Sequence, residues 1–365
     1  MKILHIVRQF SPSIGGIQDF VYNLSLQQVR RGLNVTVYTL DTDFKSNRKY
    51  EKYNFESGFH IVRFSWYGSS RYPICFIPCE LLNSFDIIHV HAVDFFVEYT
   101  SFLKRIGRLT PKLILTTHGG IFHTKKHILL KKLFFNTFTP LSLRFFDSVI
   151  CCSVNDHNLF SSFDVNTVLI ENGVSFSKFG KKLRRQRNND FIYFGRFSEN
   201  KKIPELIKLF SLMPNPDIKL KIIGKSNSGS VDLFKTLIGK HNLNVELHID
   251  IDDTEILEHL SSAKFTVSAS SYEGFGLSVI ELMSYGLIPL LSKDPPSFRK
   301  FILDSGCGAT FSREPELFND IVNQLISSWS HEKVLLATNY SLKFSWNEVE
   351  ILYSDVYQKV LYPNN

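Results

Sequence analysis

Two glutamates eight residues apart flank a glycine turn in the segment Glu273-Gly274-Phe275-Gly276-Leu277-Ser278-Val279-Ile280-Glu281. The segment follows an apolar run, Phe265–Ser268, that is typical of a buried strand, and a helix is expected to begin near Leu277. Backbone N–H groups at such a helix start can bind phosphate, and here they would belong to Phe275, Gly276 and Leu277. Glu273 and Glu281 can accept hydrogen bonds from ligand hydroxyls. The pattern therefore predicts a site for a phosphorylated ligand that carries hydroxyl groups.

A cluster of cations follows the apolar run Phe191–Phe194 and consists of Arg196, Lys201 and Lys202, after the glycine Gly195. Cations five or six residues apart at a strand end can converge on a diphosphate. A diphosphate is a poor leaving group unless its developing charge is neutralised, and these side chains can do that without a metal. An ordinary surface charge run is the alternative interpretation.

Two further turns carry candidate residues in the first half of the chain. Gly15 and Gly16 lie between the first apolar run and a periodic helical stretch, where free N–H groups can hold a phosphate. His118 follows another strand-like run and precedes Gly119-Gly120, which places it to touch a ligand. A plain tight turn and a structural histidine are the alternatives.

Apolar runs typical of buried strands alternate with helix-like stretches along the chain, which predicts an α/β fold with parallel sheets. A polar stretch at residues 176–190 interrupts the alternation and is interpreted as a linker. We expect a first domain at 1–175, a second at 191–342, and a C-terminal helix at 343–365 that packs back toward the first domain. Ligands of such sheets bind at the carboxyl ends of strands, where all the candidate residues lie.

The composition is ordinary for a soluble globular protein, with 44% hydrophobic and 21% charged residues among 365. The formal net charge is +7, and residues 1–175 carry 19 Lys and Arg against 13 Asp and Glu, a net +6. This basic half favours an anionic partner, such as a phosphate-bearing substrate or a membrane surface, unless it is merely a solvated face. No nucleic-acid-binding motif accompanies it.

The five cysteines, odd in number and without a secretion signal, are typical of reduced thiols in a cytosolic protein. No Cys/His spacing predicts a zinc site, and no apolar run is long enough for a spanning helix. We therefore expect a cytoplasmic location.

These motifs resemble glycosyltransferase family 4, retaining enzymes with two facing Rossmann-like domains (the GT-B fold) and a central cleft. The glutamate pair is the most specific match, and the Gly195-Arg196 to Lys201 spacing and the turn Glu171–Val174 also fit. The resemblance implies that Glu273 orients the transferred sugar, that His118 contacts it, and that Glu281 binds ribose. It implies a nucleotide-sugar donor and no metal or organic cofactor, with the donor diphosphate bound by Gly15, Gly16, Arg196, Lys201, Lys202, Phe275, Gly276 and Leu277.

The first half is more similar still to the mannosyltransferases of xanthan and acetan assembly, in the segments 7–16, 69–73, 89–96 and 117–124. Those enzymes move mannose from GDP-mannose onto a polyprenyl-diphosphate-linked cellobiose. Because the first domain of the family contacts the acceptor, the resemblance implies a lipid-linked oligosaccharide acceptor in exopolysaccharide, capsule or O-antigen assembly.

A lipid-linked acceptor requires membrane contact, and the region Phe122–Phe146 interleaves lysines with large apolar residues. Such a basic, apolar-rich helix can lie in an anionic lipid interface. We therefore expect a peripheral protein on the inner face of the cytoplasmic membrane. A helix packed against its own domain is the alternative interpretation of the same residues.

Other readings of the same motifs remain open. A family 4 transferase could use a UDP-sugar, since no residue distinguishes guanine from uracil. A sugar-nucleotide epimerase or a phosphorylase can share the two-domain plan, although a phosphorylase needs a much longer chain. A non-catalytic sugar-nucleotide-binding module would have no chemical need for Glu273, Glu281, Arg196 and Lys201 together.

Overall fold

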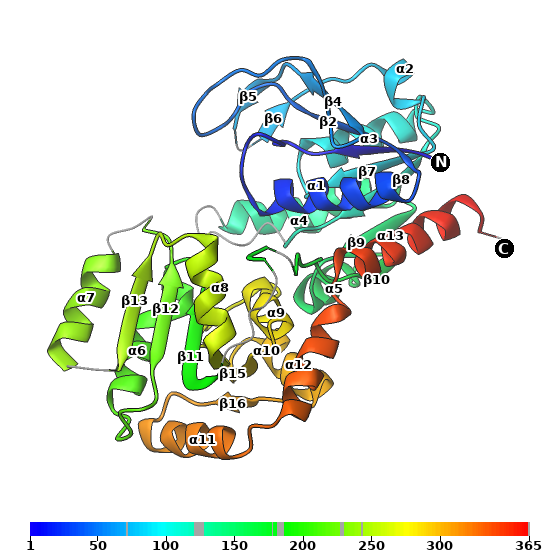
Figure 1. Ribbon diagram of the computed structural model, residues 1–365. Helices are drawn as coiled ribbons and strands as arrows, with labels where there is room; N and C mark the ends of the chain where they lie inside the picture. Colours follow the sequence, from blue (N-terminus) through cyan, green and yellow to red (C-terminus); the bar gives the residue numbers. More distant parts are fainter. Residues whose placement is uncertain are drawn as a thin grey trace. The chain divides into compact units, whose positions relative to one another are not determined.

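The computed structural model describes residues 1–70, 72–119, 128–176, 178–180, 186–226, 230–241 and 244–363. The chain forms two compact units: a first unit of Met1–Gly173 with Trp346–Asn365, and a second unit of Val174–Ser345. Each unit has a central sheet with helices on both faces (Figure 1). Within the described residues, no helix combines the length and apolar character needed to cross a membrane.

The sheet of the first unit has eight strands in the order β10-β9-β8-β7-β1-β2-β4-β3. All neighbouring pairs are parallel except β3 and β4. The strands are β1 Lys2–Ile6, β2 Asn34–Leu40, β3 Tyr53–Glu56, β4 Phe59–Phe64, β7 Ile87–His91, β8 Lys112–Thr116, β9 Ser148–Cys151 and β10 Thr167–Leu169. A separate antiparallel pair consists of β5 Tyr67–Ser69 and β6 Tyr72–Ile74.

Helices cover both faces of this sheet because successive strand residues point to opposite sides. One face packs on α1 Gly16–Arg30 and on the C-terminal helix α13 Trp346–Leu361. The other packs on α3 Phe95–Arg105, α4 Ile128–Leu143 and α5 Val154–Phe160. A short helix, α2 Cys79–Leu82, precedes β7. In β1, Ile3 therefore joins the core under α1 and α13, whereas Leu4 joins the opposite core.

The sheet of the second unit has six parallel strands in the order β13-β12-β11-β14-β15-β16. The strands are β11 Asn188–Phe194, β12 Leu220–Gly224, β13 Val245–Ile249, β14 Ala263–Ser268, β15 Ile288–Ser292 and β16 Ala309–Phe311. Numbered within this unit, the strand order is 3-2-1-4-5-6, which is the doubly wound Rossmann order. Strands are added first on one side of β11 and then, from β14 onward, on the other, so the strand order has its reversal point between β11 and β14. A ligand site is expected beyond the carboxyl ends of these two strands.

Helices also sandwich the second sheet. One face packs on α6 Ile203–Ser211, α7 Ser230–His241 and α11 Pro315–Ser327. The other packs on α8 Asp253–Ser262, α9 Leu277–Ser284, α10 Pro296–Ser305 and α12 His331–Leu342. The expected α/β class is thus confirmed, with parallel pairing throughout the second sheet and everywhere in the first sheet except between β3 and β4.

Strand β11 begins at Asn188, three residues before the start expected from the apolar run and inside the polar stretch assigned to a linker. The reason is that Asp190 is a buried strand residue, and its carboxylate pairs with Lys221 Nζ of the neighbouring strand β12 at 2.7 Å. The charges of Asp190 and Lys221 thus neutralise each other inside the sheet. Polarity alone therefore misplaces the start of this strand.

Helix α13 contributes core residues to the first unit although it ends the chain. Trp346, Val349, Tyr353 and Tyr357 are buried against the α1 face of the sheet. Replacing Tyr353, which is fully buried, by Ala should cost about 3–5 kcal/mol of unfolding free energy, because a large cavity opens in this core.

The change should appear as a clear loss of thermal stability in calorimetry. Leu352→Ala on the same helix is the matched control, because Leu352 is 45% exposed and its truncation should change stability by roughly 0.5 kcal/mol or less. Equal stability of the two variants would contradict this packing.

Candidate functional site

The loops after β11 and β14 carry most of the predicted site residues of the second unit. The first loop runs from Gly195 through the short 3₁₀ helix Glu199–Lys201 to α6. The second runs from Ala269 to Gly276, before α9. Because β11 and β14 are adjacent parallel strands at the reversal point, both loops leave the same edge of the sheet.

An ion pair joins the two loops: Lys201 Nζ lies 2.5 Å from Glu273 Oε1. Both side chains are largely enclosed, with 14% of Lys201 and 12% of Glu273 exposed. A partly desolvated pair of this kind interacts more strongly than a surface pair, because water screens it less. The cation and the carboxylate predicted separately from the sequence are therefore direct neighbours.

Hydroxyl and amide groups hold the Glu273 loop in place. Ser270 Oγ donates to Glu273 Oε1 at 2.7 Å, so the same carboxylate oxygen receives both a hydroxyl proton and the lysine charge. Ser271 N donates to the carbonyl of Asn200 at 2.8 Å, and Asn200 Nδ2 donates to the carbonyl of Tyr272 at 3.0 Å. These bonds cross from one loop to the other, which fixes the position of Glu273 relative to Lys201.

Among the described residues, the other two cations of the group form no ion pair with Glu273. Lys202 adopts a left-handed conformation with φ of 55°, and its Nζ lies 3.5 Å from Glu205 on α6. Arg196 is exposed, and its carbonyl accepts a hydrogen bond from Tyr193 Oη at 2.8 Å. Within the described part of the chain, the guanidinium of Arg196 forms no ion pair, so it is available to an anionic ligand.

The glycine turn places a helix start at the same edge. As expected, α9 begins at Leu277, and Gly276 precedes it with φ of 107°. A Cβ at Gly276 would lie 3.0 Å from the Phe298 ring, so both the backbone angle and the space call for glycine. The first helical bond runs from Val279 N to the carbonyl of Gly276, which leaves the N–H groups of Leu277 and Ser278 ahead of it. These groups can bind an anion.

Phe275 contributes its backbone alone to this turn. Its ring is buried between Phe301, at 5.3 Å between centroids, and Phe344, at 5.2 Å. The side chain therefore anchors the turn in the core while the N–H remains at the helix start.

Glu281 lies one turn into α9 and does not contact Glu273. Its Oε1 lies 3.3 Å from Lys178 Nζ, and burial raises the pKa of this carboxyl although the lysine opposes that shift. Although its side chain is largely buried, the Glu281 carboxylate can still accept hydrogen bonds from hydroxyls.

In the first unit, Gly15 and Gly16 lie at the start of α1, as predicted. Gly15 is the N-cap and supplies no side-chain hydrogen bond to the helix. A Cβ at Gly16 would meet nothing within 4 Å, so space beside this residue is open. The first helical bond runs from Asp19 N to the carbonyl of Gly15, which leaves earlier N–H groups for an anion.

His118 occupies a turn that two sets of contacts hold. Its φ is 53°, an uncommon value for a residue with a side chain. Asp156 Oδ2 accepts from Thr117 Oγ1 and from Gly119 N, both at 2.8 Å. The imidazole points into the unit, where Nε2 lies 2.9 Å from His91 Nδ1 and the ring packs edge-on against Phe20.

Burial lowers the pKa of the His118 imidazole to about 3, so the ring is neutral near pH 7. In this arrangement the ring is neutral and its Nε2 faces His91. The N–H groups of Thr117 and Gly119 are also bonded within the unit, to Ile150 and Asp156.

Several residues of these sites escaped the sequence interpretation, notably Ser270 and Asp156. Ser270 lies three residues before Glu273, and Asp156 lies 37 residues after Gly119, so only the fold brings Asp156 to its partners. A polar residue just after β14 is a weak signal for Ser270, and the sequence holds no local signal for Asp156.

Two clusters among the described residues have the composition of a cation site: His5, His89 and His91 in the first unit, and His248, Glu255 and His259 in the second. Neither includes Lys201, Glu273, Arg196 or Glu281. The positive charge beside Glu273 comes instead from lysine.

The region predicted to contact a membrane is only partly described. Residues 120–127, which include Gly120, Lys125 and Lys126, lie outside the described residues. Helix α4 exposes three large apolar side chains: Leu133 at 61%, Phe138 at 59% and Leu141 at 55%. Phe135 on the same helix is buried in the core, so α4 has both a packed and an exposed apolar surface.

Models of two protein families match the two halves of the chain. The family described as "Glycosyltransferase Family 4" matches residues 14–178, and "Glycosyl transferases group 1" matches residues 175–340. A GDP-mannose:cellobiosyl-diphosphopolyprenol alpha-mannosyltransferase of Komagataeibacter xylinus is 31% identical, over 99% of this chain and 94% of that protein. One of the same name from Xanthomonas campestris is 33% identical over 99% and 97%.

Solved structures with the same fold cover the whole chain. A sucrose-phosphate synthase of Thermosynechococcus elongatus has a TM-score of 0.73 at 16% identity, with 100% of both chains covered. A glycosyltransferase of Rickettsia africae has a TM-score of 0.74 at 16% identity, with 100% and 99% covered. Family models match both halves of the chain, and two relatives that span 99% of it are more than 30% identical. The chain therefore belongs to glycosyltransferase family 4.

Proposed function

We propose that this glycosyltransferase transfers mannose from GDP-mannose to a polyprenyl-diphosphate-linked oligosaccharide with retention of anomeric configuration. The observation that carries the transfer chemistry is the Lys201–Glu273 pair beyond the reversal point of the second sheet. The choice of donor and acceptor is supported by relatives whose names state GDP-mannose and cellobiosyl-diphosphopolyprenol, and which match 99% of this chain. The product would serve the assembly of a surface polysaccharide.

The charges at this edge suit a departing nucleoside diphosphate. In the absence of a ligand Lys201 is neutralised by Glu273. A bound diphosphate supplies a second anion, and Lys201, exposed Arg196 and the first N–H groups of α9 can share its charge as the glycosidic bond breaks. Lys201 is assigned this role rather than Lys202, whose side chain faces Glu205.

Glu273 then orients the sugar through hydrogen bonds to its hydroxyls. Its carboxylate is held by Ser270 and Lys201 and is not free to rotate, a precondition for precise orientation. It is not assigned as a covalent nucleophile; the acceptor attacks the face that the diphosphate leaves, and the departing phosphate assists. Glu281 binds the ribose hydroxyls from α9.

The first unit supplies the remaining groups in this proposal. His118 contacts the transferred sugar, and the bonds from Asp156 to its neighbours and from His91 to its ring hold the turn in place. The open N–H groups beside Gly16 contact the donor phosphates.

A lipid-linked acceptor also needs contact with a membrane, which we assign to the segment Phe122–Phe146. The exposed apolar side chains Leu133, Phe138 and Leu141 of α4 support this assignment. The protein would then act as a peripheral protein on the inner face of the cytoplasmic membrane.

Glu273→Gln should fold normally but transfer sugar at least about 100-fold more slowly, because the amide keeps the shape while losing the charge that holds Lys201. The measurement is the initial rate of glycolipid formation. Glu316→Gln, which changes an exposed glutamate on α11, is the matched control and should retain the native rate. Native turnover of Glu273→Gln would exclude the site assignment.

GDP-mannose should raise the melting temperature by several degrees when present at about 100 times its Kd, since binding then adds about 2.7 kcal/mol. UDP-glucose, UDP-galactose and free mannose at the same concentration should not. Differential scanning fluorimetry measures all four. A rise with UDP-sugars alone would show that the donor base is uracil.

The protein should bind vesicles that contain anionic phospholipid at low salt and dissociate at high salt, because screening weakens attraction between lysines and the lipid surface. The double variant Phe138→Ser/Leu141→Ser should bind at least about fivefold more weakly, since apolar insertion is lost. Leu335→Ser, which removes an equally exposed leucine from α12, is the control. Vesicle sedimentation that shows no native binding at low salt would refute the membrane assignment.

A further inference from the structure

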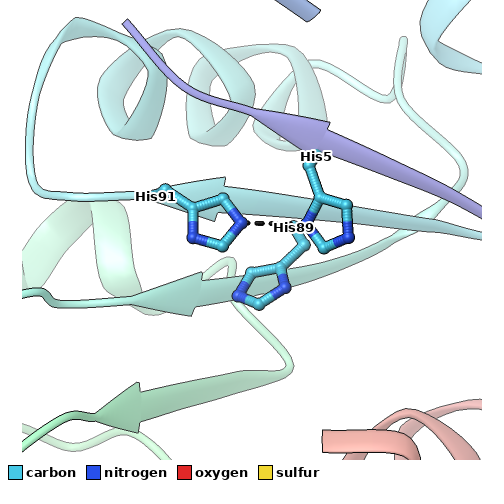
Figure 2. A group of neighbouring side chains, drawn as sticks. All are labelled: His5, His89 and His91. Carbon is cyan, nitrogen blue, oxygen red and sulfur yellow. Dashed lines mark hydrogen bonds between the residues drawn. The ribbon is translucent and has the colours of Figure 1, made fainter. Parts of the chain in front are cut away.

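A group of histidines is buried under α1 and α13 in the first unit. His5 comes from β1, and His89 and His91 come from β7; all three are at most 1% exposed. Figure 2 shows them side by side, with a dashed bond between His5 and His91. The parallel register places His5 opposite His89 and places His91 opposite Thr116, two residues before His118. Polar groups buried this deeply need hydrogen-bond partners.

Those partners form a continuous chain that ends at His118. Its links are Gln28 Oε1 to His5 Nε2 at 2.7 Å, His5 Nδ1 to His91 Nε2 at 2.9 Å, and His91 Nδ1 to His118 Nε2 at 2.9 Å. The far nitrogen, His118 Nδ1, lies 3.8 Å from Cys152 Sγ. We call this chain the histidine relay.

The relay is directional because every imidazole in it is neutral, and the orientation of the Gln28 amide sets which way its bonds run. Burial lowers the pKa of His5 to about 4 and that of His118 to about 3, and burial also holds the pKa of His91 well below 6.5. A neutral imidazole has one donor nitrogen and one acceptor nitrogen. Since the Gln28 oxygen can only accept, His5 donates from Nε2, and His91 and His118 must then do the same.

A second branch of hydrogen bonds takes its direction from the same Gln28 amide. Gln28 Nε2 donates to Tyr357 Oη at 3.2 Å, so Tyr357 donates its own proton to His89 Nδ1 at 2.7 Å. His89 Nε2 then donates to Thr116 Oγ1 at 2.6 Å. With Oε1 toward His5 and Nε2 toward Tyr357, the amide satisfies both branches, and turning it over would reverse every bond in both. The direction of both branches therefore depends on this one side chain.

We infer that Gln28 is a positioning residue: through His5 and His91 it sets the tautomer of His118 and anchors the ring of the left-handed turn. Asp156 holds the residues on either side of His118, and the relay holds His118 itself. A turn with an uncommon backbone angle keeps its shape only where its surroundings determine it fully. That this turn serves sugar transfer rests on the proposed function; the tautomer does not.

A metal ion is the competing interpretation, since nitrogens of His5, His89 and His91 lie within 4.8 Å of one another. A cation would require three lone pairs that converge on one point. Instead, both ring nitrogens of each of these histidines have hydrogen-bond partners, and the partners include Gln28, Tyr357, Thr116 and His118. The geometry is that of a relay.

The test is nitrogen NMR of protein labelled with ¹⁵N only in histidine, with signals assigned by single His→Gln variants and metal content measured on the same sample. In the native protein, His5, His91 and His118 should each carry the proton on Nε2. Gln28→Met, nearly equal in size but without an amide, should leave His118 with averaged signals from both tautomers. Gln27→Met on the same helix, at a partly exposed position, should match the native spectrum.

The same variants separate the relay from the proposed function. Gln28→Met should lower kcat for transfer about tenfold with little change in the KM for donor, because the turn loses its inner anchor. An Nδ1-protonated His118 in the native protein, an unchanged His118 in Gln28→Met, or stoichiometric bound metal would overturn the relay. The native spectrum decides this even where Gln28→Met does not fold. If the native NMR spectra match those expected but the native protein transfers no sugar, the relay stands and the proposed function is refuted.

Discussion

The ion pair between Lys201 and Glu273 is the interaction on which the proposed donor site depends. It joins the loops after β11 and β14, two strands whose adjacency follows from the 3-2-1-4-5-6 order of the sheet. Neither side chain is stable alone in so enclosed a position, because an unpaired charge there would lose hydration without compensation. The pair therefore holds the two loops together and supplies a cation for the proposed ligand. A bound diphosphate can pair with Lys201 while the Ser270 hydroxyl still donates a hydrogen bond to Glu273.

In the first unit, several contacts hold the turn at His118 in an uncommon backbone conformation. His118 has a positive φ, and its neighbours are tied to the Asp156 carboxylate while its ring is tied to the relay. The relay reaches α1 at Gln28 and α13 at Tyr357, so the C-terminal helix of the chain supports a turn more than 200 positions earlier. Together with the burial of Tyr353 and Tyr357 in this core, these bonds attach the last helix to the first unit.

The sequence predicts the elements better than the contacts between them. The start of α9 at Leu277 and the strand before it follow from apolar periodicity and the glycine turn, and the carboxyl-end rule indicates that Glu273 and the cations share an edge. The choice between Lys201 and Lys202 does not follow, because it depends on the left-handed backbone of Lys202. The early start of β11 was missed because Asp190 is polar but paired inside the sheet. The relay was missed because it requires the register of β1 against β7.

In the proposed reaction, this edge of the second sheet releases a nucleoside diphosphate while a sugar passes to a lipid-linked acceptor with retention of anomeric configuration. The most direct measurement is incubation of the protein with GDP-mannose and polyprenyl-diphosphate cellobiose, followed by mass spectrometry and proton NMR of the glycolipid. The account predicts a gain of one hexose and an anomeric signal of the α configuration. A β product, or release of GDP with no gain of mass by the glycolipid, would contradict it.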